Sequence, residues 1–208
     1  MFDKITKPLV QLVESAGSVV GIRTVEEPTY GSEQLTKQVE IRRYGPRIAA
    51  ETVVDGDEIS SRSEGFRRLA RYIFGQNRGR ARIEMTAPVG QQQAGGSQQI
   101  AMTAPVGSSS SRLGWVVRFY MPAGCTLESL PVPDDDRVRL VEVPAESVAV
   151  LRFSGTATPA AVAARTAELR RELQAYGFEM VGPSATWLYD PPWTIPFRRR
   201  NEIAIGVT

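Results

Sequence analysis

The sequence has no histidine and a single cysteine, Cys125, among its 208 residues. The lack of histidine excludes imidazole acid–base chemistry, Ser–His–Asp and Cys–His catalysis, and zinc or haem held by histidine. One cysteine cannot form a disulfide within the chain, which fits a reducing compartment. An enzyme built on this sequence would therefore depend on carboxylates, tyrosine, lysine, arginine or a cofactor.

Long apolar runs are also missing. Asp3, Lys7, Gln11 and Glu14 interrupt the N-terminal segment, so it is too polar for a secretory signal or a bilayer span. Its apolar residues fall on one helical stripe, which predicts an amphipathic helix and linker over 1–24. We expect this helix to dock on the body of the protein or on a partner, with membrane-surface association or disorder as lesser alternatives. We expect a cytoplasmic protein.

The excess of basic over acidic residues is small, with a net charge of +2. The basic residues are almost all arginine, since lysine occurs only at positions 4, 7 and 37. Arginine clusters at 78–82 and 198–200 could form a basic patch. Nucleic-acid binding calls for more net charge and interleaved exposed aromatics, so we expect no nucleic-acid partner.

The periodicity of the first half predicts strands and one helix. Alternation over 39–44 and strand-forming residues over 48–54 predict two strands joined by a turn at Gly45 and Pro46. A helix is predicted to follow, with Ser61 and Glu64 as an S-x-x-E capping box. Its apolar residues have the spacing of one helical face, namely Phe66, Leu69, Ala70, Ile73 and Phe74.

The second half repeats this order of elements. Thr158 and Pro159 are typical of an N-cap and first helical residue, and the helix is predicted to end at Gly177. Its predicted inward residues are Val162, Thr166, Leu169, Leu173 and Tyr176. Strand pair, helix and strands thus occur twice. This predicts an α+β fold, mainly antiparallel, in one domain over 25–208.

An octapeptide, I-x-M-T-A-P-V-G, occurs at 83–90 and again at 100–107. Its alternation favours strands, with each proline near a strand end. Met85 and Met102 could also be soft metal ligands, but apolar strand filler is the simpler interpretation because no cysteine or histidine accompanies them. The Gln/Gly/Ser string at 90–99 between the copies is predicted to be a loop, and a lid function is an alternative.

Seven motifs together resemble the SOUL haem-binding protein family. They run in family order from about Tyr30 to Val207 and read VEIRRYGPRIAAETVV, GFRRLARYIFGQN, IAMTAPV, WVVRFYMP, LPVPDDDRV, VAVLRFSG and YDPPWTIPFRRRNEIAI. The resemblance implies a distorted antiparallel β-barrel of two pseudo-symmetric halves, each with one helix. It also implies reversible, non-catalytic binding of haem or another porphyrin.

A histidine ligand, proposed for some members, cannot be used by this sequence. Other members are thought to hold the macrocycle by apolar contact with the first helix and by basic side chains at its carboxylates. The resemblance then implies that Arg71 pairs with a propionate, with Arg62 or Arg67 as a second candidate. The full set of implied binding residues is Phe66, Arg67, Leu69, Ala70, Arg71 and Phe74. Core packing on a sheet explains the apolar members equally well.

Two other functions stay open at this point. The fold could bind a different amphipathic small molecule, or a hydrolase could use Tyr189 or Glu202. The structural alternative is that Asp190 fixes a turn and that Glu202 pairs with an arginine of the FRRRNE motif. Cys125 could ligate iron only as a thiolate, which needs a lowered pKa.

Overall fold

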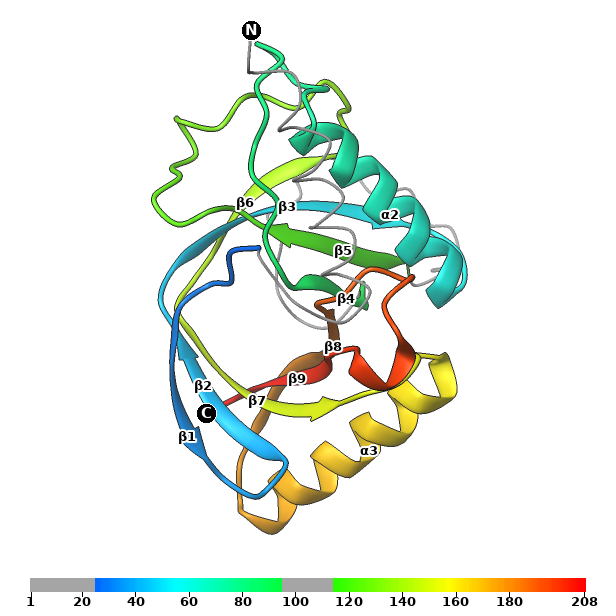
Figure 1. The fold of residues 1–208 in the computed structure, drawn as a ribbon. Coiled ribbons are helices and arrows are strands. Elements are labelled where there is room, and N and C mark those ends of the chain that lie inside the picture. The colour runs from blue at the N-terminus through cyan, green and yellow to red at the C-terminus, as the bar shows by residue number, and fades with distance from the viewer. Residues whose placement is uncertain (1–24, 95–113) are drawn as a thin grey trace, which may run out of the picture.

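The computed structural model describes residues 25–94 and 114–208 (Figure 1). The predicted N-terminal helix, the second copy of the octapeptide with Met102, and residues 95–99 of the Gln/Gly/Ser string lie outside the described residues. The strands are β1 (Tyr30–Gln34), β2 (Val39–Tyr44), β3 (Arg47–Val54), β4 (Val89–Gln93), β5 (Trp115–Tyr120), β6 (Arg139–Val143), β7 (Glu146–Phe153), β8 (Met180–Leu188) and β9 (Asn201–Val207). The helices are α2 (Glu58–Ile73), α3 (Pro159–Ala175) and the short 3₁₀ helix η1 (Pro196–Arg198).

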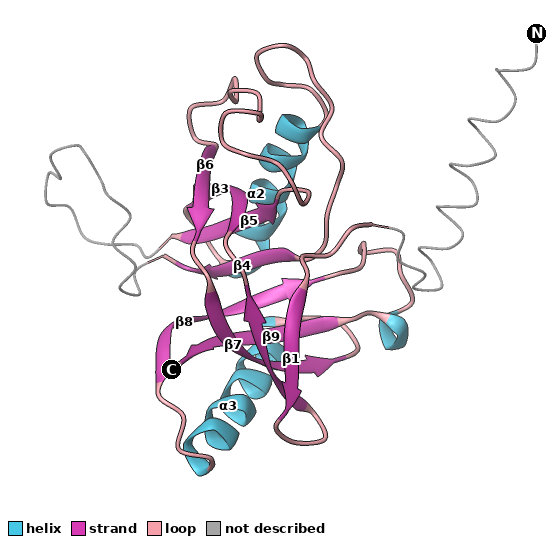
Figure 2. Ribbon diagram, turned by 90° about the vertical axis from the view of Figure 1, so that its left-hand side faces the viewer, coloured by secondary structure: helices cyan, strands magenta, loops and turns pink. Residues whose placement is uncertain are grey.

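The described strands form one antiparallel sheet in the order β1-β2-β7-β9-β8-β4-β5-β3-β6. α2 packs on β3 and β5 at one end, and α3 packs mainly on β7 and β9 at the other (Figures 1 and 2). The α+β class with one helix in each half is confirmed. The expected barrel is wrong as a closed structure. Within the described residues β1 and β6 are free edges, so the sheet is curved but open.

The two halves exchange strands. β2 and β3 are joined only by Gly45 and Pro46, yet β2 pairs with β7 while β3 pairs with β5 and β6. The two strands and the turn are present as predicted, but β2 and β3 do not pair with each other. Two-residue hairpins favour positive φ at their central residues, whereas Gly45 lies outside that region and proline keeps the preceding residue extended. The chain accordingly continues from one half of the sheet into the other.

The duplication of elements is visible in the burial of the strands. β3 and β7 show the same sequence of exposed, intermediate and buried residues along their eight positions. Each is followed by the helix that covers its own half. Because side chains alternate across a strand, each strand gives one set of residues to the core beneath its helix and the other set to the opposite face.

α2 begins earlier than the capping-box pattern predicts. Its N-cap is Asp57, whose Oδ1 accepts hydrogen bonds from the backbone N–H groups of Ile59 and Ser60, each at 3.0 Å. Ser61 lies inside the helix and is fully buried, and its hydroxyl has no hydrogen-bond partner among the described residues. The capping-box prediction is therefore wrong. The helix ends at Ile73, before Gly75 with its positive φ of 106°.

The face of α2 that meets the sheet is rotated from the predicted one. Leu69 and Ile73 are buried as expected, but Phe66 is only partly covered and Phe74 is mostly exposed. Gly65 explains the rotation. A Cβ at this position would lie 2.5 Å from Val117 Cγ2, so the helix approaches β5 most closely along its glycine.

α3 follows its sequence signals. The Thr158 side chain accepts a hydrogen bond from the N–H of Ala161 at 3.2 Å, and Pro159 is the first helical residue. Leu169 and Leu173 are fully buried in the core cluster of this half. Tyr176, expected to point inward, is 56% exposed because the helix ends one residue earlier.

Candidate functional site

The outward side of α2 carries an apolar stripe, which we call the α2 flank and define as Ile59, Phe66, Ala70 and Phe74. Phe66 is 37% exposed and Phe74 is 58% exposed, although large apolar residues on a surface helix normally face its core. The Phe66 ring also meets the ring of Phe119 on β5, edge to face with centroids 5.4 Å apart. The α2 flank is therefore held by the sheet at its centre while its outer surface stays accessible.

The first copy of the octapeptide lies along the same half. Ile83 donates its N–H to the carbonyl of Ile73 at 2.8 Å, and Ile83 and Met85 pack against the core cluster beneath α2. The strand predicted for this segment starts only at Val89. The loop prediction for residues 90–99 is wrong over 90–93, because these residues belong to β4, where all pair with β5 and 90–92 also pair with β8.

The basic residues predicted for the site differ in how far they are engaged. Arg71 is exposed, and its side chain makes no hydrogen bond or ion pair with a described residue. Arg67 forms an exposed ion pair with Glu64 at 3.0 Å. Arg62 is held on three sides, by Gln91 at 2.6 Å, by Glu58 at 2.7 Å and by a backbone carbonyl. Arg71 is thus the basic candidate with no competing described partner.

Leu69 and Ala70, the remaining predicted members, differ in accessibility. Leu69 has no exposed surface and packs in the core beneath the helix, whereas Ala70 is partly exposed. The structure therefore brings Phe66, Ala70, Arg71 and Phe74 to the accessible side of one helix. It places Leu69 behind them.

The described part of this half has few side chains suited to bind iron through sulfur. Burial and the charge of Glu26 raise the pKa of the Cys125 thiol, which keeps it protonated and opposes thiolate ligation. Met85 is partly buried against the core. Among residues 25–94 and 114–208, no group of three or more His, Cys, Asp or Glu could hold a metal ion. The α2 flank thus offers two partly exposed aromatic rings, and the exposed side chain of Arg71 follows Ala70 in the same helix.

A second constellation, not predicted from the sequence as a unit, is buried between strands of the other half. Arg42 donates to both carboxylate oxygens of Glu202, at 2.7 and 2.9 Å, although the two residues lie 160 positions apart. Arg200 donates to the same carboxylate at 2.8 Å and the Tyr189 hydroxyl does so at 2.7 Å. Glu202 is completely buried and Arg42 is 1% exposed. The expected pairing of Glu202 with an arginine of the FRRRNE motif is present.

The electrostatics of this cluster are those of a structural ion pair. Burial pushes the pKa of Glu202 upward, but the hydrogen bonds and charges of Arg42, with the charge of Arg200, outweigh it and leave that pKa below its usual range. Burial and the neighbouring carboxylate raise the pKa of Tyr189 far above its ordinary value. Glu202 has four donor contacts and no exposed surface. It is therefore not positioned to take a proton from a bound substrate.

Comparison with protein families shows which family this chain belongs to. Residues 25–206 match the SOUL heme-binding protein family, so the chain belongs to that family. A comparison with curated proteins finds no sequence match. Among described residues, no helix is both long enough and apolar enough to cross a membrane.

Several solved structures share the fold at low sequence identity. An uncharacterized conserved protein from Listeria innocua is 14% identical with a TM-score of 0.56, covering 83% of this chain and 93% of that one. A hydrolase from Listeria innocua is 12% identical with a TM-score of 0.55, over 83% and 93% of the two chains. The EcmrR C-terminal domain is 12% identical with a TM-score of 0.51, over 82% and 97%. At such identities the likeness concerns the fold alone.

Proposed function

We propose that this protein binds haem or a related tetrapyrrole on the α2 flank, without catalysis and without a histidine ligand to iron. Membership of the SOUL heme-binding protein family supports the ligand class. The observation that carries the location is the exposure of Phe66 and Phe74 along α2, whose Leu69 and Ile73 are buried against the sheet. Two accessible aromatic rings on one helix offer a planar apolar ligand the surface it needs to leave water.

The other predicted residues take separate roles in this proposal. Ala70 lies between the two rings, where its small side chain allows a flat ligand to approach the helix. Arg71 pairs with a ligand carboxylate, because a guanidinium without a described partner needs no existing ion pair to be broken first. Arg67 is the second candidate and must give up Glu64 to bind a carboxylate. Leu69 seats the helix on the sheet and does not touch the ligand.

The test of this proposal compares two ligands that share a macrocycle and differ in iron. Haemin and metal-free protoporphyrin are titrated separately into the full chain, with absorbance and tryptophan quenching as readouts. Apolar packing with carboxylate pairing predicts saturable binding of both with similar dissociation constants. Binding of haemin alone would show that iron ligation carries the affinity. If neither ligand binds, the tetrapyrrole proposal is wrong and the α2 flank is a candidate site for another amphipathic ligand.

Arg71 is tested by reversing its charge. Arg71→Glu should weaken protoporphyrin binding about tenfold, the loss of one charge-assisted contact plus new repulsion of the ligand carboxylate. Arg171→Glu is the matched control, since it is an exposed arginine on α3. Unchanged affinity in Arg71→Glu, at unchanged thermal stability, would exclude a carboxylate contact at this position.

A further inference from the structure

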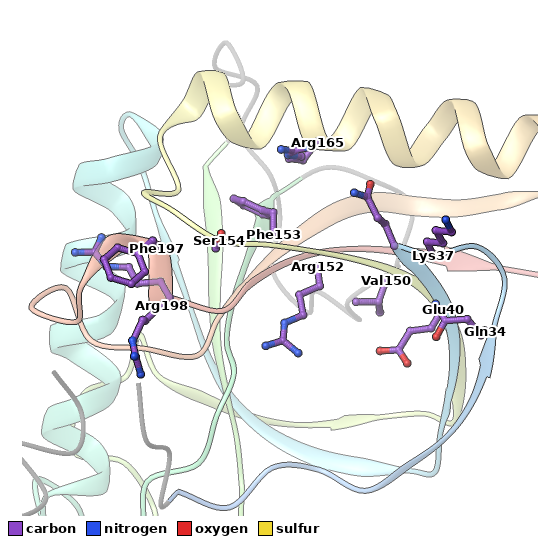
Figure 3. Close-up of a pocket in the computed structure, with 12 residues that line it drawn as sticks. Gln34, Lys37, Glu40, Val150, Arg152, Phe153, Ser154, Arg165, Phe197 and Arg198 are labelled. Carbon is purple, nitrogen blue, oxygen red and sulfur yellow. The ribbon is translucent and has the colours of Figure 1, made fainter. Parts of the chain in front are cut away.

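A concave site, which we call the basic pocket, lies in the half of the sheet covered by α3 (Figure 3). Its volume is about 640 Å³. This lies within the range of roughly 300–1,000 Å³ that is usual for small-molecule sites. None of its lining residues belongs to α2, so it is separate from the α2 flank.

The lining of the basic pocket is strongly asymmetric in charge. Five cations reach it from four parts of the chain, namely Lys37, Arg152, Arg165, Arg198 and Arg199. Glu40 is the one carboxylate in the lining, and it already accepts a hydrogen bond from Arg42 Nε at 2.7 Å. The pocket therefore concentrates positive charge in a protein whose net charge is only +2.

Two of the arginines are fixed by contacts outside the pocket. Arg165 on α3 pairs with Glu168 at 2.6 Å. Arg199 donates from Nε to the carbonyl of Thr194 at 2.8 Å, which orients the side chain without neutralising it. These contacts hold the guanidinium groups in place before any ligand arrives, which lowers the entropic cost of binding.

Arg152 and Lys37 have no such engagement. Neither side chain makes a hydrogen bond or ion pair with any described residue, and both residues are exposed. Arg152 stands directly opposite Glu202 in the register of β7 and β9, but Arg42 and Arg200 already bind that carboxylate. Figure 3 shows the Arg152 side chain between those of Glu40 and Arg198 in this view. The pocket thus presents two cations whose charge no described side chain compensates.

We propose that the basic pocket binds a small organic anion carrying two or more phosphate or carboxylate groups. Guanidinium groups match both kinds of oxyanion bidentately, and Lys37 adds a point charge at the β1–β2 turn. Phe197, 71% exposed in the lining, offers an apolar face to the carbon part of such a ligand. This site is additional to the tetrapyrrole surface and does not depend on it.

The test uses pyrophosphate and citrate as probes, titrated calorimetrically into the full chain at constant ionic strength. Saturable one-to-one binding of either probe supports the site, and the stronger of the two identifies phosphate or carboxylate as the preferred group. Arg152→Gln and Lys37→Gln should each weaken binding about tenfold, the loss of one charge-assisted contact. Arg170→Gln is the matched control, because Arg170 is an exposed arginine of α3 outside the pocket lining.

Three results would overturn the proposal. The first is that neither probe binds at millimolar concentration. The second is that Arg170→Gln weakens binding as much as Arg152→Gln, which would mean that the probes are attracted by the overall positive charge and not by the pocket. The third is that Arg152→Gln also abolishes protoporphyrin binding, which would assign the pocket to the tetrapyrrole. Thermal unfolding of each free variant serves as a check on folding. We expect Arg152→Gln to be at least as stable as wild type, because removing the positive charge of Arg152 reduces the repulsion among the pocket cations.

Discussion

Breaking the buried Arg42–Glu202 ion pair should strongly reduce the stability of the protein. Glu202→Gln retains the shape of the side chain but removes the charge that Arg42 and Arg200 bind at 2.7–2.9 Å. Removing one member of a buried ion pair leaves the other charge uncompensated and typically costs about 3–5 kcal/mol. The cost should fall towards the lower end, because Arg42 keeps its contact with Glu40. Glu33→Gln, which breaks an exposed pair with Arg43, should cost at most about 1 kcal/mol.

Urea unfolding followed by circular dichroism measures the free energy of unfolding of both variants. The pH dependence of that free energy tests whether the charge of Glu202 is the cause. The pKa of Glu202 is lowered by folding, so its contribution is present above the ordinary glutamate pKa and is lost as the pH falls through the folded value. The stability gap between wild type and Glu202→Gln should therefore shrink as the pH is lowered from about 7 towards about 3. A Glu202→Gln protein within about 1 kcal/mol of wild type at neutral pH would refute this account of the cluster.

Two further predictions concern α2, each measured by urea unfolding. Gly65→Ala should destabilise the protein by about 1–3 kcal/mol, because the new Cβ would lie 2.5 Å from Val117. Helix propensity alone predicts that alanine stabilises the helix by about 1 kcal/mol. A more stable variant would therefore contradict the close approach of α2 to β5. Asp57→Ala should cost about 1 kcal/mol through loss of the N-cap, whereas Ser61→Ala should be neutral or stabilising because it removes a buried hydroxyl without a described partner. A larger loss of stability in Ser61→Ala than in Asp57→Ala would show that Ser61 is the N-cap.

Local signals in the sequence predicted α3 well. Thr158, Pro159 and Gly177 mark its ends by backbone chemistry that depends on few neighbours, and Leu169 and Leu173 follow its period. The start of α2 was less predictable because two capping patterns overlap there. Asp57 accepts two backbone N–H groups and lengthens the helix by one turn, so the earlier cap prevails over Ser61.

Strand pairing could not be predicted from the sequence because it is decided at long range. The pattern around Gly45 and Pro46 predicts two strands correctly but not their long-range partners, which lie in β7 for β2 and in β5 and β6 for β3. The same limit applies to Arg42 and Glu202. Each looks like an ordinary charged residue of a half-exposed strand until the exchange of strands brings them together.

The sequence predicts that Phe66, Leu69 and Phe74 share one apolar stripe, but it does not predict the different environments that the fold gives them. Periodicity assigned Phe66 and Phe74 to the same face as Leu69, since all fit one broad apolar stripe. The sheet selects a narrower face centred on Gly65 and Leu69, where the helix comes closest to β5. As a result, Phe66 stays partly exposed at the border of this face and Phe74 lies beyond it. Their exposure, which periodicity alone could not distinguish from burial, is what recommends them as ligand contacts.

The most direct measurement of the central claim is the dissociation constant of metal-free protoporphyrin for two matched variants. Phe74 and Tyr176 are the C-cap residues of α2 and α3, and they are 58% and 56% exposed. Phe74→Ala should weaken binding about tenfold, because one aromatic ring then no longer leaves water against the ligand. Tyr176→Ala should leave the constant unchanged. Equal effects in the two variants, or no effect of Phe74→Ala, would contradict binding on the α2 flank.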